Sequence, residues 1–186
     1  MCGIIAAASN RNVGKLLVQG LHKMEYRGYD SAGVAIVQSD GKVQRRREVG
    51  KVVNLSNDLD ADPLKGSLGI AHTRWATHGG VQQTNTHPHM SGNDLALVHN
   101  GIIENYMALR EELQSKGYVF ASETDSETIV HLIHSCLGND GLMQAVRRAV
   151  KRLEGAYAIA VCWADEPDRI IAALSLIHIS EPTRPY

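Results

Sequence analysis

The second residue, Cys2, carries a thiol beside a potential free α-amine. The chain begins Met1-Cys2-Gly3, and cells routinely remove an initiator Met that precedes a small side chain. Removal would place a nucleophile and a base on one residue, because an α-amine titrates near ~7.7–8.0 and its neutral form can accept the thiol proton. An N-terminal amine is a known activator of weak nucleophiles. On position alone, the more common explanation is a small apolar residue that opens a strand.

Three polar clusters could complete a site around such a nucleophile. They are His72–Gly79, His99–Asn105 and Ser122–Glu127. Each also has a purely structural explanation. Arg74 could form a surface ion pair, and Asn100-Gly101 is a common turn dipeptide. The Ser/Thr/Asp cluster could simply cap a helix, where acidic side chains complement the N-terminal dipole.

The nine histidines do not form the pattern of a metal site. His87 and His89 are close in sequence, and His131 and His134 share a predicted helix. Neither pair has the cysteine or carboxylate neighbours expected of zinc ligands. Glycine-rich runs that precede Lys-Ser or Lys-Thr are also absent, so no phosphate loop is predicted. We therefore expect no metal and no cofactor.

Composition excludes several classes of protein. A chain of 186 residues suits one domain with a substantial core. A net charge of -1 and 5% aromatic residues give no reason to expect nucleic acid as a partner. Apolar runs stay below ~18 residues and no signal-peptide pattern is visible, so we expect no membrane partner. Three cysteines are an odd and sparse set, which favours a reducing compartment and a cytoplasmic location.

The elements that must position the clusters are mainly strands at both ends of the chain. Hydrophobic patterning predicts strands over 4–8, 34–37, 42–49, 69–75, 96–100, 157–163 and 170–173. It predicts helices over 13–25, 104–116, 125–137 and 142–153, with Asn12 as a cap for the first. Asp40-Gly41 marks a hairpin turn. Strands first, then helices, then strands is an α+β order.

Four ordered clusters together resemble one family. They are Cys2-Gly3-Ile4, Arg27–Gly33, His72–Gly79 and His99–Asn105. The chain resembles the class II, N-terminal-nucleophile (Ntn) amidotransferases. The particular likeness is to the glutaminase domain of the glutamine–fructose-6-phosphate aminotransferases (isomerizing), the glucosamine-6-phosphate synthases. The resemblance covers residues 1–173. Purine-pathway members of the same class resemble the chain less, since we expect them to lack the run Trp75–His78.

The resemblance assigns roles to nine residues. Cys2, Asn100 and Gly101 are the expected catalytic residues, with Cys2 as nucleophile and the other two as the oxyanion hole. The expected substrate-binding residues are Arg27, Arg74, Trp75, Thr77, His78 and Asp125. Arg74 would clamp the α-carboxylate of glutamine, because a guanidinium fork suits bidentate pairing. Asp125 would hold the α-ammonium.

The implied fold has four layers, αββα, with two stacked and mainly antiparallel sheets. The implied activity is hydrolysis of L-glutamine to glutamate and ammonia through a Cys2 thioester. In the parent enzyme the ammonia reaches an isomerase domain that binds fructose 6-phosphate, and the parent is expected to be a homodimer. The alternatives are a catalytically silent glutamine-binding fragment and the glutaminase domain of a purine-pathway amidotransferase.

The sequence departs from the family over residues 174–186, which we interpret as a non-family tail that arose from a frameshift or from a cloning or sequencing artefact. Family members continue with further strands of the same domain. We therefore expect the fold to be incomplete at its C-terminus, with unpaired strand edges.

Overall fold

The computed structural model describes residues 2–76 and 79–175. Its strands form two antiparallel sheets of four strands each. The first sheet has the order β1 (Gly3–Ala8), β4 (Leu68–Arg74), β2 (Ser31–Val37) and β3 (Val43–Val49). The second has the order β5 (His89–Ser91), β6 (Leu95–Ile103), β7 (Gly155–Trp163) and β8 (Ile170–Leu174).

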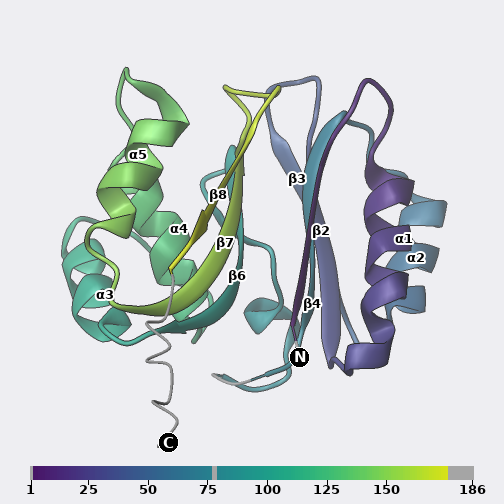
Figure 1. Ribbon diagram of the computed structural model, residues 1–186, viewed down its shortest axis with the longest axis horizontal. Helices are drawn as coiled ribbons and strands as arrows, with labels where there is room; N and C mark the ends of the chain where they lie inside the picture. Colours follow the sequence, from purple (N-terminus) through teal and green to yellow (C-terminus); the bar gives the residue numbers. More distant parts are fainter. Residues whose placement is uncertain (1, 77–78, 176–186) are drawn as a thin grey trace, which may run out of the picture.

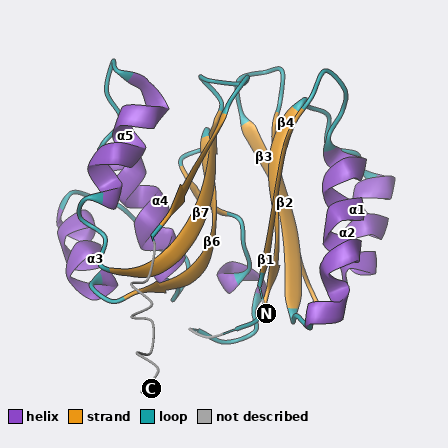
Figure 2. Cartoon of the chain, viewed as in Figure 1, coloured by secondary structure: helices purple, strands orange, loops and turns teal. Residues whose placement is uncertain are grey.

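Helices cover the outer face of each sheet (Figures 1 and 2). Helices α1 (Gly14–Met24) and α2 (Val52–Ala61) lie on the first sheet. Helices α3 (Tyr106–Ser115), α4 (Asp125–Ser135) and α5 (Gly141–Val150) lie on the second. Two short 3-10 helices, η1 (Glu25–Arg27) and η2 (Gln83–Asn85), interrupt the connecting segments. The predicted four-layer αββα arrangement is confirmed.

Three apolar cores hold the layers together, one between each pair of neighbouring layers. The inter-sheet core is built largely from small and β-branched side chains, including Ala35, Ala96, Val98 and Ala160. Each strand presents every second residue to the facing sheet, and small side chains at these positions let the two sheets pack closely.

Strand alternation carries polar residues into the space between the sheets. In β4, Leu68 and Ile70 belong to the inter-sheet core, so the same face continues with His72 and Arg74. In β6, Ala96 and Val98 belong to that core, and their face continues with Asn100. The apolar part of each strand thus packs in the core between the sheets, and the polar residues at its end face the same inter-sheet space.

Gly33 of β2 is required by a close backbone approach. A Cβ at this position would lie 2.2 Å from the carbonyl oxygen of His87, well inside any real contact. The glycine therefore lets the segment before β5 lie directly against the first sheet. This is a physical reason for glycine at the end of the Arg27–Gly33 cluster.

Side-chain hydrogen bonds lie at the starts of two helices. Asn12 accepts a hydrogen bond from the Gly14 amide at 2.9 Å, but it stands one residue before Val13, the N-cap of α1, which has no side-chain cap. Thr124 is the N-cap of α4, and its hydroxyl accepts from the Glu127 amide. Helix α4 is buried along most of its length, which holds its first turn firmly against β6.

The predicted elements are present, with boundaries shifted by a few residues. Sequence reasoning missed α2 and the short strand β5. The signal for α2 was available, because Val52, Leu55 and Leu59 recur at helical spacing and pack on the first sheet.

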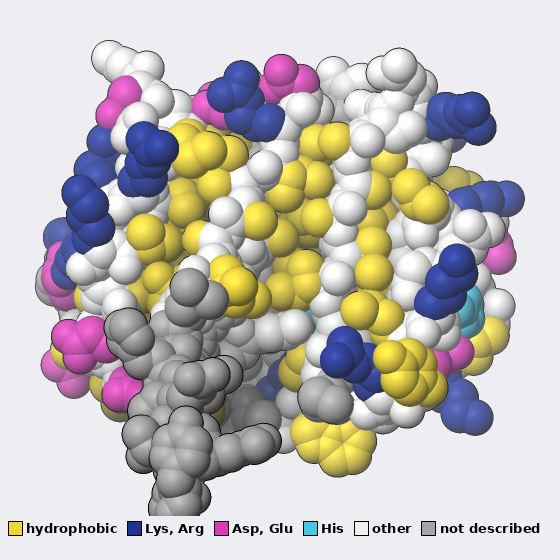
Figure 3. Space-filling view, viewed as in Figure 1, with side chains coloured by type: hydrophobic (Ala, Val, Ile, Leu, Met, Phe, Trp, Pro, Cys, Tyr) yellow, Lys and Arg dark blue, Asp and Glu magenta, His cyan; other side chains and the backbone are white. Residues whose placement is uncertain are grey.

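Strands β1 and β8 lie next to each other at one side of the sandwich, and each is the end strand of its sheet among the described residues. Apolar side chains gather over this side (Figure 3). Leu174, the last residue of β8, is 68% exposed. A long apolar edge of this kind is usually covered in a complete fold.

Candidate active site

Cys2 lies immediately before β1, where the end of β4 reaches it. The backbone amide of Trp75 donates a hydrogen bond to Cys2 Sγ at 3.2 Å. The sulfur also lies 3.6 Å from the Trp75 carbonyl oxygen. This proximity follows from the register of the two strands, which pairs Gly3 with Thr73. The sulfur is partly exposed, so a small molecule can reach it.

A cavity of about 250 Å³ opens beside this sulfur. Six of the nine sequence-predicted site residues line it: Cys2, Arg74, Trp75, Asn100, Gly101 and Asp125. They come from both sheets and from the first turn of α4. Residues 72 to 75 and 99 to 102, predicted separately as strand ends, therefore meet at one place.

Arg74 brings a buried cation to the cavity. Its side chain is only 4% exposed, and its guanidinium lies 4.0 Å from Asp30 Oδ1. It also donates to the carbonyl oxygens of Gly79 and Gly80 at 3.4 and 3.3 Å. These contacts hold the planar fork in place, which suits it to bidentate binding of a carboxylate.

Asp125 brings a carboxylate to the opposite side of the site. It is the first residue of α4, and its Oδ2 accepts a hydrogen bond from the Ile103 amide at 2.9 Å. Its Oδ1 lies 3.4 Å from the Ser126 hydroxyl, which donates to it. Asp125 thus presents an acidic side chain, fixed by these donors, that could pair with an ammonium group.

Asn100 and Gly101 line the cavity between these two charges. The Asn100 Oδ1 lies 2.7 Å from His72 Nε2 of the facing sheet. Gly101 has φ +133°, and a Cβ there would lie 2.1 Å from the Ala156 carbonyl oxygen of β7. Only glycine fits this position, because any Cβ would clash with the backbone of β7.

The remaining predicted site residues differ in how they are placed. Trp75 is 52% exposed, and its indole lies against Gly28, whose Cβ position is 3.3 Å from Trp75 Cζ3. Arg27 is exposed at the end of η1, next to this contact, and is not among the described residues that line the cavity. Thr77 and His78 lie outside the described residues.

Four buried histidines, His72, His87, His89 and His99, form a cluster at the cavity, and two of them, His87 and His99, line it. The rings of His72 and His87 have centroids 4.2 Å apart, and those of His87 and His89 are 4.7 Å apart. Burial lowers the pKa of His72 to about 4 and lowers the pKa values of His87 and His89 well below the usual range. These rings are therefore neutral at pH 7.

Sequence reasoning missed this histidine cluster because its members come from three separate segments. Only the alternation of β4 and β6 hinted that His72 faces the other sheet. Within the described part of the chain, no three His, Cys, Asp or Glu side chains are placed to hold a metal ion together.

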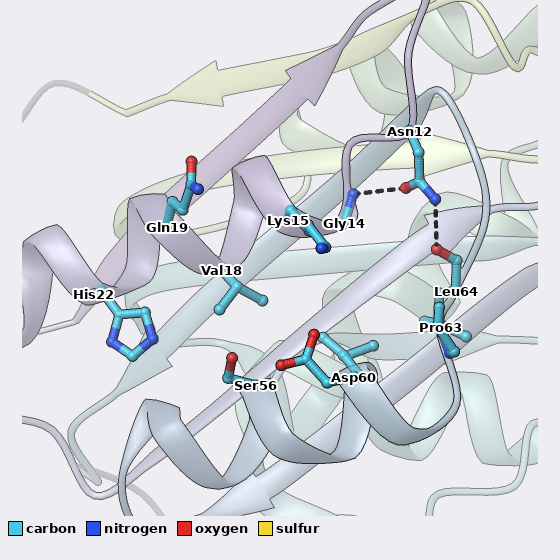
Figure 4. Close-up of a pocket in the computed structure, with 11 residues that line it drawn as sticks. Asn12, Gly14, Lys15, Val18, Gln19, His22, Ser56, Asp60, Pro63 and Leu64 are labelled. Carbon is cyan, nitrogen blue, oxygen red and sulfur yellow. Dashed lines mark hydrogen bonds between the residues drawn. The ribbon is translucent and has the colours of Figure 1, made fainter.

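A larger cavity, of about 390 Å³, lies between α1 and α2 on the outer helical layer. Figure 4 shows Lys15 and His22 of α1 on one side of it and Ser56 and Asp60 of α2 on the other. It holds none of the predicted site residues, and the first sheet separates it from Cys2. Size alone therefore does not identify the reactive site.

Known proteins share both the sequence and the fold. Residues 72–175 match the family described as glutamine amidotransferase domain. The chain is 57% identical to the glutamine–fructose-6-phosphate aminotransferase (isomerizing) of Pseudomonas putida and 56% identical to that of Pseudomonas aeruginosa. Each alignment covers 94% of this chain and 29% of the relative. The chain thus spans less than a third of the length of these relatives.

Two solved structures have the same architecture. One is glutamine phosphoribosylpyrophosphate amidotransferase from B. subtilis, with a TM-score of 0.77 and 26% identity. The other is described as the allosteric regulatory enzyme of purine biosynthesis, with a TM-score of 0.78 and 27% identity. Both matches cover 94% of this chain and 37% of the other. The αββα sandwich is that of the Ntn amidotransferases.

Among the residues that the structure describes, no helix is both long and apolar enough to cross a membrane. A buried guanidinium, a carboxylate at a helix start, an amide and a thiol thus meet in one small cavity of this sandwich. Fold, site geometry and sequence similarity agree, and the chain belongs to the glutamine amidotransferase domain family.

Proposed function

We propose that this chain hydrolyses the side-chain amide of L-glutamine to glutamate and ammonia, with Cys2 as the nucleophile. The observation that carries the proposal is the single cavity shared by the thiol of Cys2, the Asn100-Gly101 pair and the opposite charges of Arg74 and Asp125. Few small molecules other than an amino acid with an amide side chain would use all of these groups at once.

The two charges would bind the backbone end of glutamine. Arg74 pairs with the α-carboxylate, and Asp125 pairs with the α-ammonium. Binding at both groups fixes the orientation of the molecule and delivers its side-chain amide to the sulfur, which turns a bimolecular attack into a positioned one. Trp75, Thr77, His78 and Arg27 are proposed to complete the pocket around the bound amino acid.

The chemistry would proceed through a thioester. The free α-amine of Cys2 takes the thiol proton, and Sγ bonds to the amide carbon. Asn100 and the Gly101 N–H stabilise the resulting oxyanion, a contribution of about 3 kcal/mol per donor in comparable sites. The C–N bond then breaks, and the proton passes to the leaving nitrogen to give ammonia. Water hydrolyses the thioester, releases glutamate and restores the thiol.

In the parent protein this ammonia is proposed to serve an acceptor domain outside residues 1–173. Relatives more than three times as long are named glutamine–fructose-6-phosphate aminotransferases, which supports fructose 6-phosphate as the acceptor. The parent is further proposed to be a cytoplasmic homodimer. Size-exclusion chromatography with light scattering on the intact protein would test the dimer.

Two alternatives stay open to experiment. The solved purine-pathway neighbours support another acceptor, but their identity to this chain is 26–27%, against 56–57% for the fructose 6-phosphate enzymes. A silent glutamine-binding fragment is favoured if Met1 stays in place, because the α-amine is then blocked.

The test is ammonia release from glutamine by protein whose N-terminus has been verified by mass spectrometry. Protein that begins at Cys2 should release ammonia and glutamate in equal amounts. Cys2→Ala should still bind glutamine, measured by calorimetry, and release none. Cys162→Ala is the matched control, since this thiol is buried in the inter-sheet core and should be dispensable for turnover. Turnover by Cys2→Ala would reject the mechanism.

A further inference from the structure

The hydrogen bond between His72 and Asn100 joins the two sheets at the edge of the cavity. The Asn100 Oδ1 and His72 Nε2 are 2.7 Å apart. A carboxamide oxygen can only accept a hydrogen bond, so Nε2 must carry the proton. His72 is fully buried, and its other ring nitrogen, Nδ1, has no hydrogen-bond partner in the described part of the chain. An unprotonated Nδ1 agrees with a neutral ring whose proton is on Nε2.

The position of this proton decides which end of the Asn100 amide faces the substrate. With the proton on Nε2, the amide oxygen is engaged and its NH₂ group is left for the cavity that Asn100 lines. With the proton on Nδ1, the amide would turn, donate to His72 and present its oxygen instead. An oxygen there would repel an oxyanion, whereas NH₂ donors stabilise it.

The surroundings of His72 leave little freedom for its ring. It lies on β4, the strand hydrogen-bonded to both β1 and β2, and the ring of His87 packs on it with centroids 4.2 Å apart. His87 is held in turn, because its Nε2 lies 2.9 Å from the Ser126 hydroxyl and its backbone oxygen lies against Gly33. Asn100 therefore takes its orientation from a rigid neighbour.

We propose that His72, as a neutral Nε2–H tautomer, is the positioning residue that directs the NH₂ group of Asn100 into the oxyanion hole. The role rests on the proposed glutaminase activity. His72 does not touch the substrate and acts only through Asn100. Turnover would thus depend on a residue buried between the sheets as well as on the residues that line the cavity.

Substitution of His72 separates positioning from mere packing. His72→Phe keeps a ring and removes the donor, and His72→Gln keeps an N–H donor near the Nε2 position. His131→Phe is the matched control. His131 of α4 is also buried, but its ring bonds to Ser91 of β5 and not to Asn100. All variants are compared at a temperature at which each is fully folded by circular dichroism.

The expected loss is confined to steps that pass through an oxyanion. His72→Phe should lower kcat for ammonia release about 100-fold with little change in KM, as expected for an oxyanion-hole defect. His72→Gln should recover much of that loss, and His131→Phe should keep kcat within a few-fold. Alkylation of Cys2 by iodoacetamide should be unchanged in all three, since that displacement forms no oxyanion. In an Asn100→Ala background, His72→Phe should cause no further loss.

A measurement independent of turnover keeps the test separate from the proposed function. Long-range ¹H–¹⁵N correlation spectra of ¹⁵N-labelled protein report which nitrogen of each histidine carries the proton. The proposal requires His72 to be protonated at Nε2, and the Asn100 NH₂ resonances to shift in His72→Phe but not in His131→Phe. A proton on Nδ1, or equal kcat losses in the two Phe variants, overturns it. Absent turnover in the unsubstituted protein would reject the glutaminase activity and leave the tautomer result to decide the orientation of Asn100.

Discussion

The backbone amide of Trp75 donates to the sulfur of Cys2 at 3.2 Å, and the residue before it, Arg74, turns its guanidinium into the same cavity. One strand end thus holds the nucleophile and presents the proposed carboxylate clamp on consecutive residues. The spacing between the clamp and the sulfur is then set by the strand end and by the contacts that hold the Arg74 guanidinium to Asp30, Gly79 and Gly80. A rigid spacing suits a substrate whose charged end and reactive amide are a fixed number of bonds apart.

Arg74→Ala should raise the KM for glutamine steeply, by about 100-fold or more, because a buried charge pair with the substrate is lost in the ground state and the transition state alike. Steady-state ammonia release over a wide range of glutamine concentrations measures this. Arg74→Lys should recover little of the loss, since a point charge does not replace the guanidinium fork. Arg169→Ala, at a half-exposed arginine far along the chain, is the control. An unchanged KM in Arg74→Ala would remove this residue from substrate binding.

Gly101→Ala should be far more harmful than an alanine at another glycine with positive φ. At Gly101 the new Cβ meets the Ala156 carbonyl oxygen at 2.1 Å, whereas at Gly41, with φ +76°, nothing lies within 4 Å. Gly41→Ala should therefore cost about 1–2 kcal/mol, the backbone term alone. Gly101→Ala should cost several kcal/mol and also displace the proposed oxyanion donor. Urea unfolding curves of the two variants provide the comparison, and equal losses would contradict the clash.

Much of this fold was predictable because short-range patterns determine it. The runs 4–8, 69–75 and 157–163 were predicted as strands from apolar residues alone, and all three are strands. The pairing of His72 with Asn100 was not predictable, because it depends on how two sheets slide and twist against each other. Local patterning predicts the face of the strand on which each side chain lies. The stacking of the sheets decides which side chain of the facing sheet it contacts.

The site shows the same division. Cys2, Arg74 and Asn100 were identified from their residue types and their family-like spacing, and the cavity brings them together. Arg27 was identified in the same way, yet it lies at the end of an exposed 3-10 helix. The four histidines stood in segments that the sequence singled out, but nothing in the sequence showed that their rings meet, since a histidine in an apolar strand is equally consistent with simple packing.

Acid should begin to destabilise the protein near pH 6.5, above the range of ordinary carboxylates. Burial lowers the pKa of His72 to about 4 in the folded state, and also lowers those of His87 and His89, while the unfolded values stay near 6.5. The unfolded chain therefore binds more protons as the pH falls below 6.5. Each histidine removes up to about 1.4 kcal/mol of unfolding free energy per pH unit in that window.

Denaturant unfolding at about pH 7.5, 6.5, 5.5 and 5.0 measures the slope through this window. His72→Gln should show a shallower decline than the unsubstituted protein, because one of the titrating groups is gone. Glu127 does not interfere. Burial raises its pKa, but the His131 ring 3.8 Å away and hydrogen bonds from Ala121 and Ser122 outweigh burial and lower the pKa to about 2, so its contribution is lost only below about 4.5. An identical slope in His72→Gln would show that His72 does not titrate on unfolding.

Stepwise removal of the C-terminus should locate the end of the domain, which we place at residue 173, with 174–186 as a non-family tail. A chain that ends at Ser175 should melt like the full chain. It keeps the pairing of Leu174 with Ala158 and the hydrogen bonds from Ser175 to Tyr157 and Gly155. A chain that ends at Ala173 loses those contacts and should melt only slightly lower.

A chain that ends at Arg169 should lose far more, because it lacks all of β8. That strand covers one edge of β7 and buries Ile171, which is 6% exposed, in the core beneath the helices. Removal of one such side chain costs about 2–5 kcal/mol, a large share of the stability of a small domain. Differential scanning calorimetry should therefore show a cooperative transition for the first two truncations and a weak or absent one for the third. A cooperative melt without β8 would mean that β1 to β7 suffice, and a clear loss on removing only 176–186 would place the domain boundary beyond residue 173.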